Sequence, residues 1–233
     1  MDYHDRQVVV TGGTGALGSA VVAALVAAGA QCQVPVRSEA EAARFAFRSH
    51  PQVKLVAAGD LAQEATVARI YEAVPNLWAT INIAGGFAFA PIADTDRALL
   101  MGQIETNLIS CYLCCRAAAA AMGRTGVGGR IVNVAARAAL EWRTGASMTA
   151  YTASKAAVAA LTAALAEELA GQGILVNAVA PSIMDTPANR QSMPKANHDK
   201  WPKVEEVART ILFLASPDNR VTRGAVVPVY GRA

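Results

Sequence analysis

Short apolar runs alternate with longer Ala- and Leu-rich segments along the whole chain. The short runs lack polar alternation, which is typical of strands covered on both faces, and they predict strands at residues 8–10, 33–36, 53–57, 79–83, 130–134, 175–179 and 225–229. The longer segments predict helices at residues 16–28, 39–47, 62–73, 103–122, 150–169 and 204–215. Because strands and helices alternate, we expect parallel strands joined by right-handed crossovers. The sequence therefore predicts a single α/β domain over residues 1–233, with a doubly wound, Rossmann-type sheet of seven parallel strands.

One segment, residues 184–202, departs from this alternation. It is polar, it contains prolines, and it shows neither helical nor strand periodicity. Long irregular segments inside compact domains are usually functional. We therefore expect residues 184–202 to be a loop insertion that closes over a substrate.

The composition fits a protein with a large buried core. Of the 233 residues, 53% are hydrophobic and 17% are charged, and the formal net charge is +3. A chain of this length buries about 70–75% of its unfolded surface and needs no disulfide or metal to fold. The positive charges are spread out, which argues against nucleic acid or a membrane surface as partner. Because no run of about 20 unbroken apolar residues and no signal peptide is evident, we expect a cytoplasmic protein.

The cysteines and histidines do not suggest a metal site. Cys111, Cys114 and Cys115 lie in one apolar stretch, and a single C-x-x-C without a second pair is a poor zinc or disulfide framework. His4, His50 and His198 are isolated along the chain. We expect reduced, buried thiols and no bound metal.

A glycine-rich turn follows the first predicted strand and opens the first predicted helix. Residues 11–18 read Thr-Gly-Gly-Thr-Gly-Ala-Leu-Gly. Glycines at such a turn let backbone N–H groups approach a pyrophosphate, and the helix N-terminus supplies partial positive charge. This position predicts a dinucleotide site. The alternative is a turn that serves only close packing.

The end of the second predicted strand bears on which dinucleotide binds. An Asp or Glu that binds the ribose hydroxyls is expected there, but the chain has Val36 and then Arg37, with no carboxylate available. A guanidinium can hold a 2′-phosphate with two hydrogen bonds. We therefore expect NADP(H) to be preferred, with NAD(H) possible. In the alternative interpretation, Arg37 is a solvated side chain or stacks on the adenine.

Tyr151 and Lys155 lie four residues apart in a predicted helix, so they share one face. A phenol titrates near 10 in water, and a nearby ammonium favours the phenolate and lowers that pKa. Such a pair suits proton transfer to a substrate. A plain helix-surface contact is the alternative, but a nucleotide turn upstream favours the catalytic interpretation.

Several motifs in order resemble the short-chain dehydrogenase/reductase family over nearly the whole chain. The matching stretches are residues 11–18, Asp60-Leu61, residues 82–85 (Asn-Ile-Ala-Gly), Asn107, residues 130–134 (Arg-Ile-Val-Asn-Val), residues 151–155 and residues 177–182 (Asn-Ala-Val-Ala-Pro-Ser). The resemblance implies that Tyr151 donates a proton, that Lys155 binds the nicotinamide ribose, and that Asn107 holds a water in a proton relay. It also implies that the cofactor contacts Gly12, Thr14, Gly15, Ala16, Leu17, Gly18, Arg37, Asp60, Leu61, Asn82, Ala84, Gly85, Tyr151, Lys155, Pro181, Ile183 and Thr186.

Three features depart from the family pattern. Ala16 replaces the middle glycine of the usual turn, and Ile83 replaces the second Asn of the usual Asn-Asn-Ala-Gly. The family's catalytic serine is missing. It normally stands at the end of the strand predicted here at residues 130–134, a dozen or so residues before the tyrosine. This chain has Ala135, Ala136 and Ala138 in that region. The nearby hydroxyls that we consider as replacements are those of Thr144, Ser147, Thr149 and Ser154. Candidate walls of an aromatic pocket, with ordinary packing as the alternative, are Phe87, Phe89, Trp142, Met193 and Trp201.

Within the family, three stretches resemble quinonoid dihydropteridine reductase and its bacterial relatives: residues 84–86 (Ala-Gly-Gly), the serine-free residues 135–140, and the tail at residues 184–194 with Trp201. A conjugated, electrophilic substrate needs less help from a hydroxyl donor than a ketone does, and losing one such donor typically costs about 10²–10³ in rate. We therefore expect an oxidoreductase that transfers hydride to a C=O or C=N carbon of a small conjugated or cyclic substrate. Two alternatives remain: a 3-oxoacyl or simple ketone reductase that uses another hydroxyl, and a non-catalytic dinucleotide-binding sensor. The resemblance also implies a homodimer or homotetramer built through the helices at residues 103–122 and 150–169.

Overall fold

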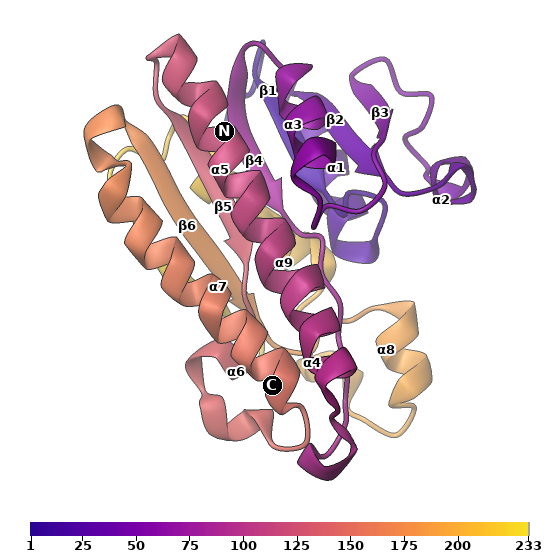
Figure 1. Ribbon diagram of the computed structural model, residues 1–233. Helices are drawn as coiled ribbons and strands as arrows, with labels where there is room; N and C mark the ends of the chain where they lie inside the picture. Colours follow the sequence, from indigo (N-terminus) through magenta and orange to yellow (C-terminus); the bar gives the residue numbers. More distant parts are fainter. Residues whose placement is uncertain (233) are drawn as a thin grey trace.

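The central element is a parallel sheet in the order β3-β2-β1-β4-β5-β6-β7, seen in the computed structural model, which describes residues 1–232 (Figure 1). The strands are β1 (Gln7–Thr11), β2 (Gln31–Val36), β3 (Val53–Ala57), β4 (Leu77–Asn82), β5 (Gly129–Val134), β6 (Ile174–Pro181) and β7 (Val226–Val229). The register places Val8 of β1 beside Cys32 of β2 and Ala79 of β4. The predicted seven-stranded, doubly wound sheet is confirmed, with strand ends that move by a residue or two.

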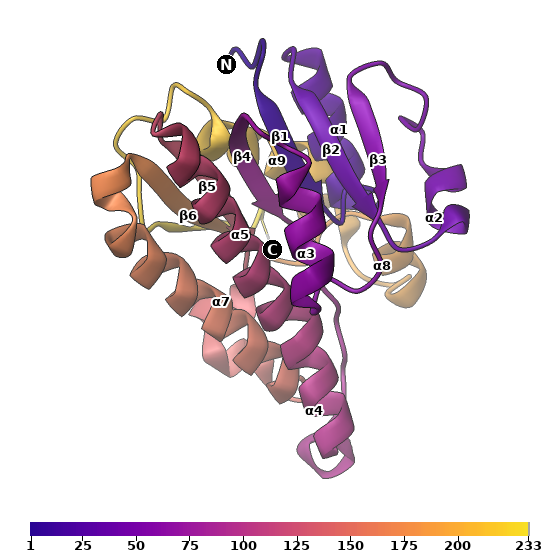
Figure 2. The same ribbon diagram turned by 45° about the horizontal axis from the view of Figure 1, so that its top comes forward.

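Helices cover both faces of this sheet (Figures 1 and 2). The α-helices are α1 (Ala16–Ala27), α2 (Glu39–Arg44), α3 (Glu64–Glu72), α4 (Arg97–Ile104), α5 (Ser110–Thr125), α6 (Arg137–Leu140), α7 (Thr149–Glu168), α8 (Pro187–Ser192) and α9 (Val204–Ala215). Helices α1 and α9 lie on one face, and α3, α5 and α7 lie on the other. Short 3₁₀ turns are Ile92–Asp94, Trp142–Gly145, Ala170–Gln172 and His198–Lys200, and a π-helical turn, Glu105–Ile109, joins α4 to α5.

Two hydrophobic cores result, one on each side of the sheet. On the first side, Leu25 of α1 and Ile211 of α9 are fully buried. On the second side, Ile70 of α3 packs in the same cluster as Ile131 of β5. Burial of each such side chain contributes about 1.5–3 kcal/mol. Because both faces are covered, successive strand positions are apolar, which explains the missing alternation in the sequence.

The winding of the chain reverses between β1 and β4. From β1 the chain passes through α1 to β2 and β3 on one side, and then returns to place β4 on the other side of β1. At such a reversal the carboxyl ends of the two strands open a crevice in which ligands bind. The glycine-rich turn at residues 12–15 leaves β1 at this point.

Two predicted helices end or begin elsewhere. The helix expected at residues 39–47 ends at Arg44, because Phe45 takes an extended backbone conformation and buries its ring in the core. The helix expected at residues 103–122 is part of a longer helical segment, Arg97–Thr125. By length and composition alone this segment is apolar enough to cross a membrane, but its α5 part packs against β4 as a core helix does.

Residues 184–202 contain more regular structure than the predicted loop. Thr186 caps α8 by accepting a hydrogen bond from the backbone N–H of Asn189, at 3.2 Å. A short parallel bridge joins Asp185 to Lys203. The Thr-Pro pair at residues 186–187 provides an N-cap and a first-turn proline, both typical of a helix start. Residues 184–202 thus form a small structured segment beside the sheet (Figure 1).

Candidate active site

A cleft of about 320 Å³ lies at the carboxyl ends of β1, β2 and β4. Eleven predicted cofactor residues line it: Gly12, Thr14, Gly15, Ala16, Leu17, Gly18, Arg37, Asp60, Leu61, Ala84 and Gly85. Its other lining residues, which the sequence reasoning missed, are Pro35, Val36, Glu41, Ala58, Gly59, Ile83, Thr106 and Ser110. The motifs from four separate stretches of sequence therefore meet in one crevice at the reversal of the sheet.

The glycine-rich turn packs tightly against the end of β4. Gly12 has a φ of 67°, and a Cβ at this residue would lie 2.8 Å from the backbone nitrogen of Ala84. A Cβ at Gly18 would lie 2.1 Å from the carbonyl oxygen of Gly12. Close packing therefore requires both glycines, and the same turn also lines the cleft. Helix α1 begins here without a side-chain cap, so the N–H groups of its first turn face the cleft without a side-chain acceptor from the N-cap residue.

A carboxylate that the sequence reasoning missed lies beside Arg37. Glu41 of α2 lines the cleft, accepts a hydrogen bond from the Thr14 hydroxyl, and accepts another from the backbone N–H of Arg37 at 2.8 Å. The expectation that no carboxylate is available at the end of β2 is therefore wrong. The pattern Ser38-x-x-Glu41 was a signal, because it is typical of a helix start with an inward-turned Glu.

The far end of the cleft meets Lys155. A Cβ at Gly85 would lie 3.3 Å from Lys155 Nζ and 2.7 Å from Asn107 Oδ1. Asn107 holds the adjacent turn at both sides, since its Oδ1 accepts from the N–H of Gly86 at 2.8 Å and its Nδ2 donates to the Gly86 carbonyl at 3.0 Å. Asn107 sits in the π-helical turn, and such turns occur frequently at functional sites.

Lys155 and Tyr151 lie one turn apart on α7. Burial lowers the pKa of the Lys155 ammonium to about 8, and its Nζ donates to the Val134 carbonyl at 2.8 Å. Burial raises the pKa of Tyr151 to about 12, and the ring of Phe87 lies edge-on against it with centroids 5.0 Å apart. The expected lowering of the tyrosine pKa is not seen, because desolvation dominates and the ammonium is directed to Val134. Tyr151 is thus a protonated phenol at neutral pH.

Six predicted cofactor residues lie outside the lining of the cleft: Tyr151 and Lys155, described above, and Asn82, Pro181, Ile183 and Thr186. Asn82 is buried, and its Nδ2 donates to Asn133 Oδ1 at 2.9 Å, which ties β4 to β5. Pro181 ends β6 and Ile183 follows it with an exposed side chain. Thr186 caps α8. The last three lie at the carboxyl end of β6, the same edge of the sheet as the cleft.

Most candidate replacements for the missing serine are engaged elsewhere. Ser154 donates to the Tyr151 carbonyl at 2.7 Å and accepts from Asn107 at 3.0 Å. Thr144 donates to the Glu141 carbonyl at 2.8 Å. Ser147, half-buried with a φ of 60° in the loop before α7, is the candidate that the geometry leaves open.

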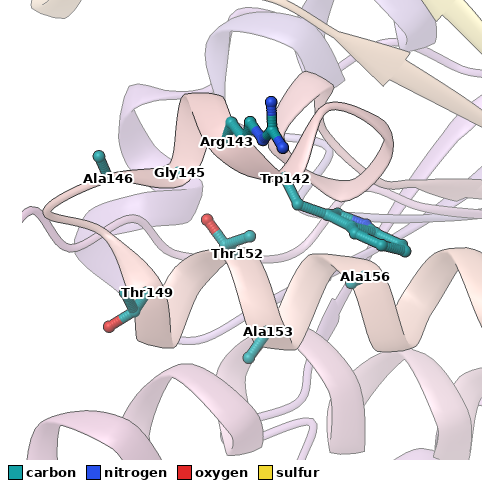
Figure 3. A pocket seen from close by; sticks show the side chains of 8 residues that line it. All are labelled: Trp142, Arg143, Gly145, Ala146, Thr149, Thr152, Ala153 and Ala156. Carbon is teal, nitrogen blue, oxygen red and sulfur yellow. The ribbon is translucent and has the colours of Figure 1, made fainter.

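A second hollow, of about 550 Å³, lies on the other face of α7 (Figure 3). One wall is the 3₁₀ turn Trp142–Gly145, in which Trp142 is 72% exposed. The other wall is formed by four α7 residues: Thr149, Thr152, Ala153 and Ala156. At helical spacing these four share a face opposite Tyr151 and Lys155. The hollow is therefore separate from Tyr151 and Lys155, and Thr149 lines the hollow rather than the cleft.

The predicted aromatic wall divides in the same way. Phe87, 62% exposed, lies beside Tyr151, whereas Trp201 is buried against His198 with ring centroids 4.6 Å apart. Trp142 belongs to the second hollow.

Within residues 1–232, no three His, Cys, Asp or Glu side chains gather as a metal site would require.

Comparison with known proteins agrees with this geometry. The family model described as "short chain dehydrogenase" matches residues 6–197. The chain is 35% identical to galactitol 2-dehydrogenase of Rhizobium johnstonii, over 96% of this chain and 93% of that one. It is 32% identical to L-xylulose reductase of Cavia porcellus, over 97% and 95% of the two chains.

A solved structure of a relative extends the match to the fold. The 3-ketoacyl-(acyl-carrier-protein) reductase from Brucella melitensis, complexed with NADH, is 25% identical and superimposes with a TM-score of 0.86, covering 98% of each chain. This chain belongs to the short-chain dehydrogenase/reductase family of oxidoreductases that use a nicotinamide dinucleotide.

Proposed function

We propose that the protein is an NADP(H)-preferring reductase in which Tyr151 donates a proton while hydride passes to a C=O or C=N carbon. The observation that carries this proposal is the position of Gly85, where the dinucleotide cleft meets Lys155. Gly85 lines the cleft, and a Cβ at this residue would lie 3.3 Å from Lys155 Nζ. The cleft fits a dinucleotide because the glycine-rich turn and the uncapped N-terminus of α1 line it at the carboxyl ends of β1 and β4, where backbone N–H groups can bind a pyrophosphate.

The catalytic roles follow from the protonation states at the site. When bound, the nicotinamide supplies the hydride. Tyr151 holds its proton at neutral pH because burial raises its pKa to about 12, so it can donate to the substrate oxygen or nitrogen. Lys155 would turn from Val134 to the nicotinamide ribose, and its ammonium would then stabilise the phenolate that forms. Asn107 supports Tyr151 and Lys155 by holding two neighbouring groups in place, the backbone of Gly86 and the hydroxyl of Ser154.

The missing hydroxyl limits the substrate. Alanines at residues 135, 136 and 138 leave a buried apolar wall where the family serine would polarise a carbonyl. An oxyanion donor is worth about 10²–10³ in rate. We infer that the substrate is a small conjugated or cyclic compound that is already electrophilic, as the resemblance to quinonoid dihydropteridine reductase suggests. Phe87 beside Tyr151 suits a flat ring.

The remaining parts of the proposal concern the coenzyme and the assembly. Arg37, at the rim of the cleft, supports the preference for NADP(H), with NAD(H) as a second coenzyme. We infer that residues 184–202 close over the substrate. We also infer a homodimer or homotetramer through α5 and α7. The small residues Ala153 and Ala156 of α7, which line the second hollow (Figure 3), suit close helix approach. Light scattering of the purified protein tests this assembly.

One alternative function has support from the comparisons. The names of the two relatives concern a sugar alcohol and a ketose, which favours reduction of a simple ketone with another hydroxyl in place of the serine. Ser147 is the hydroxyl that such a reductase would use. A Ser147→Ala variant should then lose turnover of ketones, whereas the preferred function predicts little change.

A coenzyme-oxidation screen tests the proposed function. NADPH or NADH is mixed with the protein and with quinonoid pterins, diketones, cyclic ketones or ketoses, and loss of the reduced nicotinamide is followed by absorbance. We expect oxidation with conjugated or cyclic compounds and slow reaction with open-chain ketoses. Tight NADPH binding without oxidation by any compound would favour the non-catalytic sensor instead.

A further inference from the structure

The position of Glu41 is unusual for a helix-start carboxylate. At the third position of α2, a Glu commonly turns back to the N–H of the capping residue, here Ser38. The Glu41 carboxylate reaches one residue further, to the N–H of Arg37 at 2.8 Å, and crosses to the hydroxyl of Thr14 in the glycine-rich turn. Glu41 thus brings a negative charge to the lining of the cleft, beside Val36 and Arg37 at the end of β2.

A carboxylate in this place has opposite effects on the two coenzymes. The ribose hydroxyls of NAD(H) are donors that a carboxylate accepts, and dinucleotide sites use an acidic side chain near the end of the second strand for this contact. The 2′-phosphate of NADP(H) carries negative charge at the same ribose, so a carboxylate there repels it. Arg37, in contrast, attracts the phosphate.

The two side chains differ in how strongly water screens them. The Arg37 side chain is 81% exposed, whereas the Glu41 side chain is 23% exposed, and the nearest approach of the two charges is 4.0 Å. Charge interactions of exposed groups are screened by solvent, and those of partly buried groups are screened less. The repulsion from Glu41 therefore offsets much of the attraction from Arg37.

We propose that Glu41 is a coenzyme-selecting residue, whose carboxylate binds the adenosine ribose hydroxyls of NAD(H) and limits the preference for NADP(H) that Arg37 provides. This inference rests on the proposed function, because it needs a dinucleotide in the cleft. It predicts that a 2′-phosphate binds only when the Glu41 carboxylate gives up its contact with Arg37 or Thr14. The wild type should then accept both coenzymes, and loss of the charge should make it strongly selective for NADPH.

The test measures dissociation constants of NADPH and NADH by nicotinamide fluorescence for the wild type, Glu41→Gln and Glu39→Gln. Glu41→Gln keeps the shape of the side chain and removes its charge. Glu39→Gln removes the same charge from an exposed position on the same helix, outside the cleft lining. We expect Glu41→Gln to raise the ratio of the NADH constant to the NADPH constant about tenfold or more, and Glu39→Gln to change it less than about twofold.

Further measurements distinguish coenzyme selection by Glu41 from a structural role of this residue. They also distinguish failure of this inference from failure of the proposed function. Adenosine 2′,5′-bisphosphate and 5′-AMP, used as competitors, report the ribose end alone and should show the same shift in ratio. Glu41→Asp, which keeps the charge, guards against a folding defect and should leave the wild-type ratio nearly unchanged. An unchanged ratio in Glu41→Gln, or equal weakening of both coenzymes, would overturn the inference while leaving the proposed function intact. If no variant and no wild type bound either coenzyme, both would fail.

Discussion

Replacing Lys155 with methionine tests the electrostatic state of the active site. Lys155 is 5% exposed, and burial lowers the pKa of its ammonium from 10.5 to about 8. This is a difference of about 2.5 pH units, and at about 1.36 kcal/mol per unit the folded protein disfavours the charged ammonium by about 3 kcal/mol. Methionine fills a similar volume and carries no charge.

The consequence is a pH-dependent difference in stability between the two proteins. Between pH 8 and pH 10.5 the unfolded chain holds a proton that folded Lys155 has lost, so the free energy of unfolding of the wild type rises with pH relative to that of Lys155→Met. We expect this relative gain to reach about 3 kcal/mol near pH 10.5, with no change below about pH 7. Loss of the hydrogen bond to Val134 lowers the free energy of unfolding of the variant by a nearly constant amount at every pH. It therefore leaves the slope of the stability difference against pH unchanged.

Urea unfolding of both proteins without coenzyme, at a series of pH values, gives the two free energies by linear extrapolation. The interval below about pH 7 serves as the internal control, because both folded and unfolded lysine are protonated there. A difference between the proteins that stays constant up to pH 10.5 would refute the burial of a charged ammonium beside the cleft.

Three further changes test separate parts of the site. Gly12→Ala should abolish coenzyme binding and lower the melting temperature, since its Cβ would lie 2.8 Å from a backbone nitrogen at φ 67°; Gly171→Ala, with open space around it, should do neither. Phe87→Ala should admit water to Tyr151, lower its pKa from about 12, and move the alkaline limb of the kcat/KM profile to lower pH; an unmoved limb contradicts this. Asn107→Ala should cut kcat at least about tenfold, and normal kcat would remove its positioning role.

Much of the fold was predictable from the sequence because burial on both faces leaves a plain pattern. Strands such as β5 are apolar at successive positions, and a helix such as α9 buries Val207, Ile211 and Leu214 on one side. Helix ends were less predictable, because they depend on tertiary contacts. Phe45 ends α2 by entering the core, and no residue in the sequence around it marks that contact.

The candidate site was predictable where chemistry follows a motif with fixed spacing. The glycine-rich turn and the residues near Asp60 meet in the cleft as expected. Glu41 was not found, since its carboxylate reaches the cleft by crossing from α2 to Thr14, a contact between residues 27 positions apart. The pKa of Tyr151 was also mispredicted, because spacing places an ammonium near the phenol but does not give the desolvation around it.

The most direct test of proton donation is the Tyr151→Phe variant, assayed with a substrate from the coenzyme-oxidation screen. General acid catalysis contributes about 10²–10⁴-fold, so kcat should fall by that factor. The dissociation constant for NADPH should change less than about threefold, because Tyr151 lies outside the lining of the dinucleotide cleft. Near wild-type turnover by Tyr151→Phe, with coenzyme binding intact, would contradict the role of Tyr151 as the proton donor.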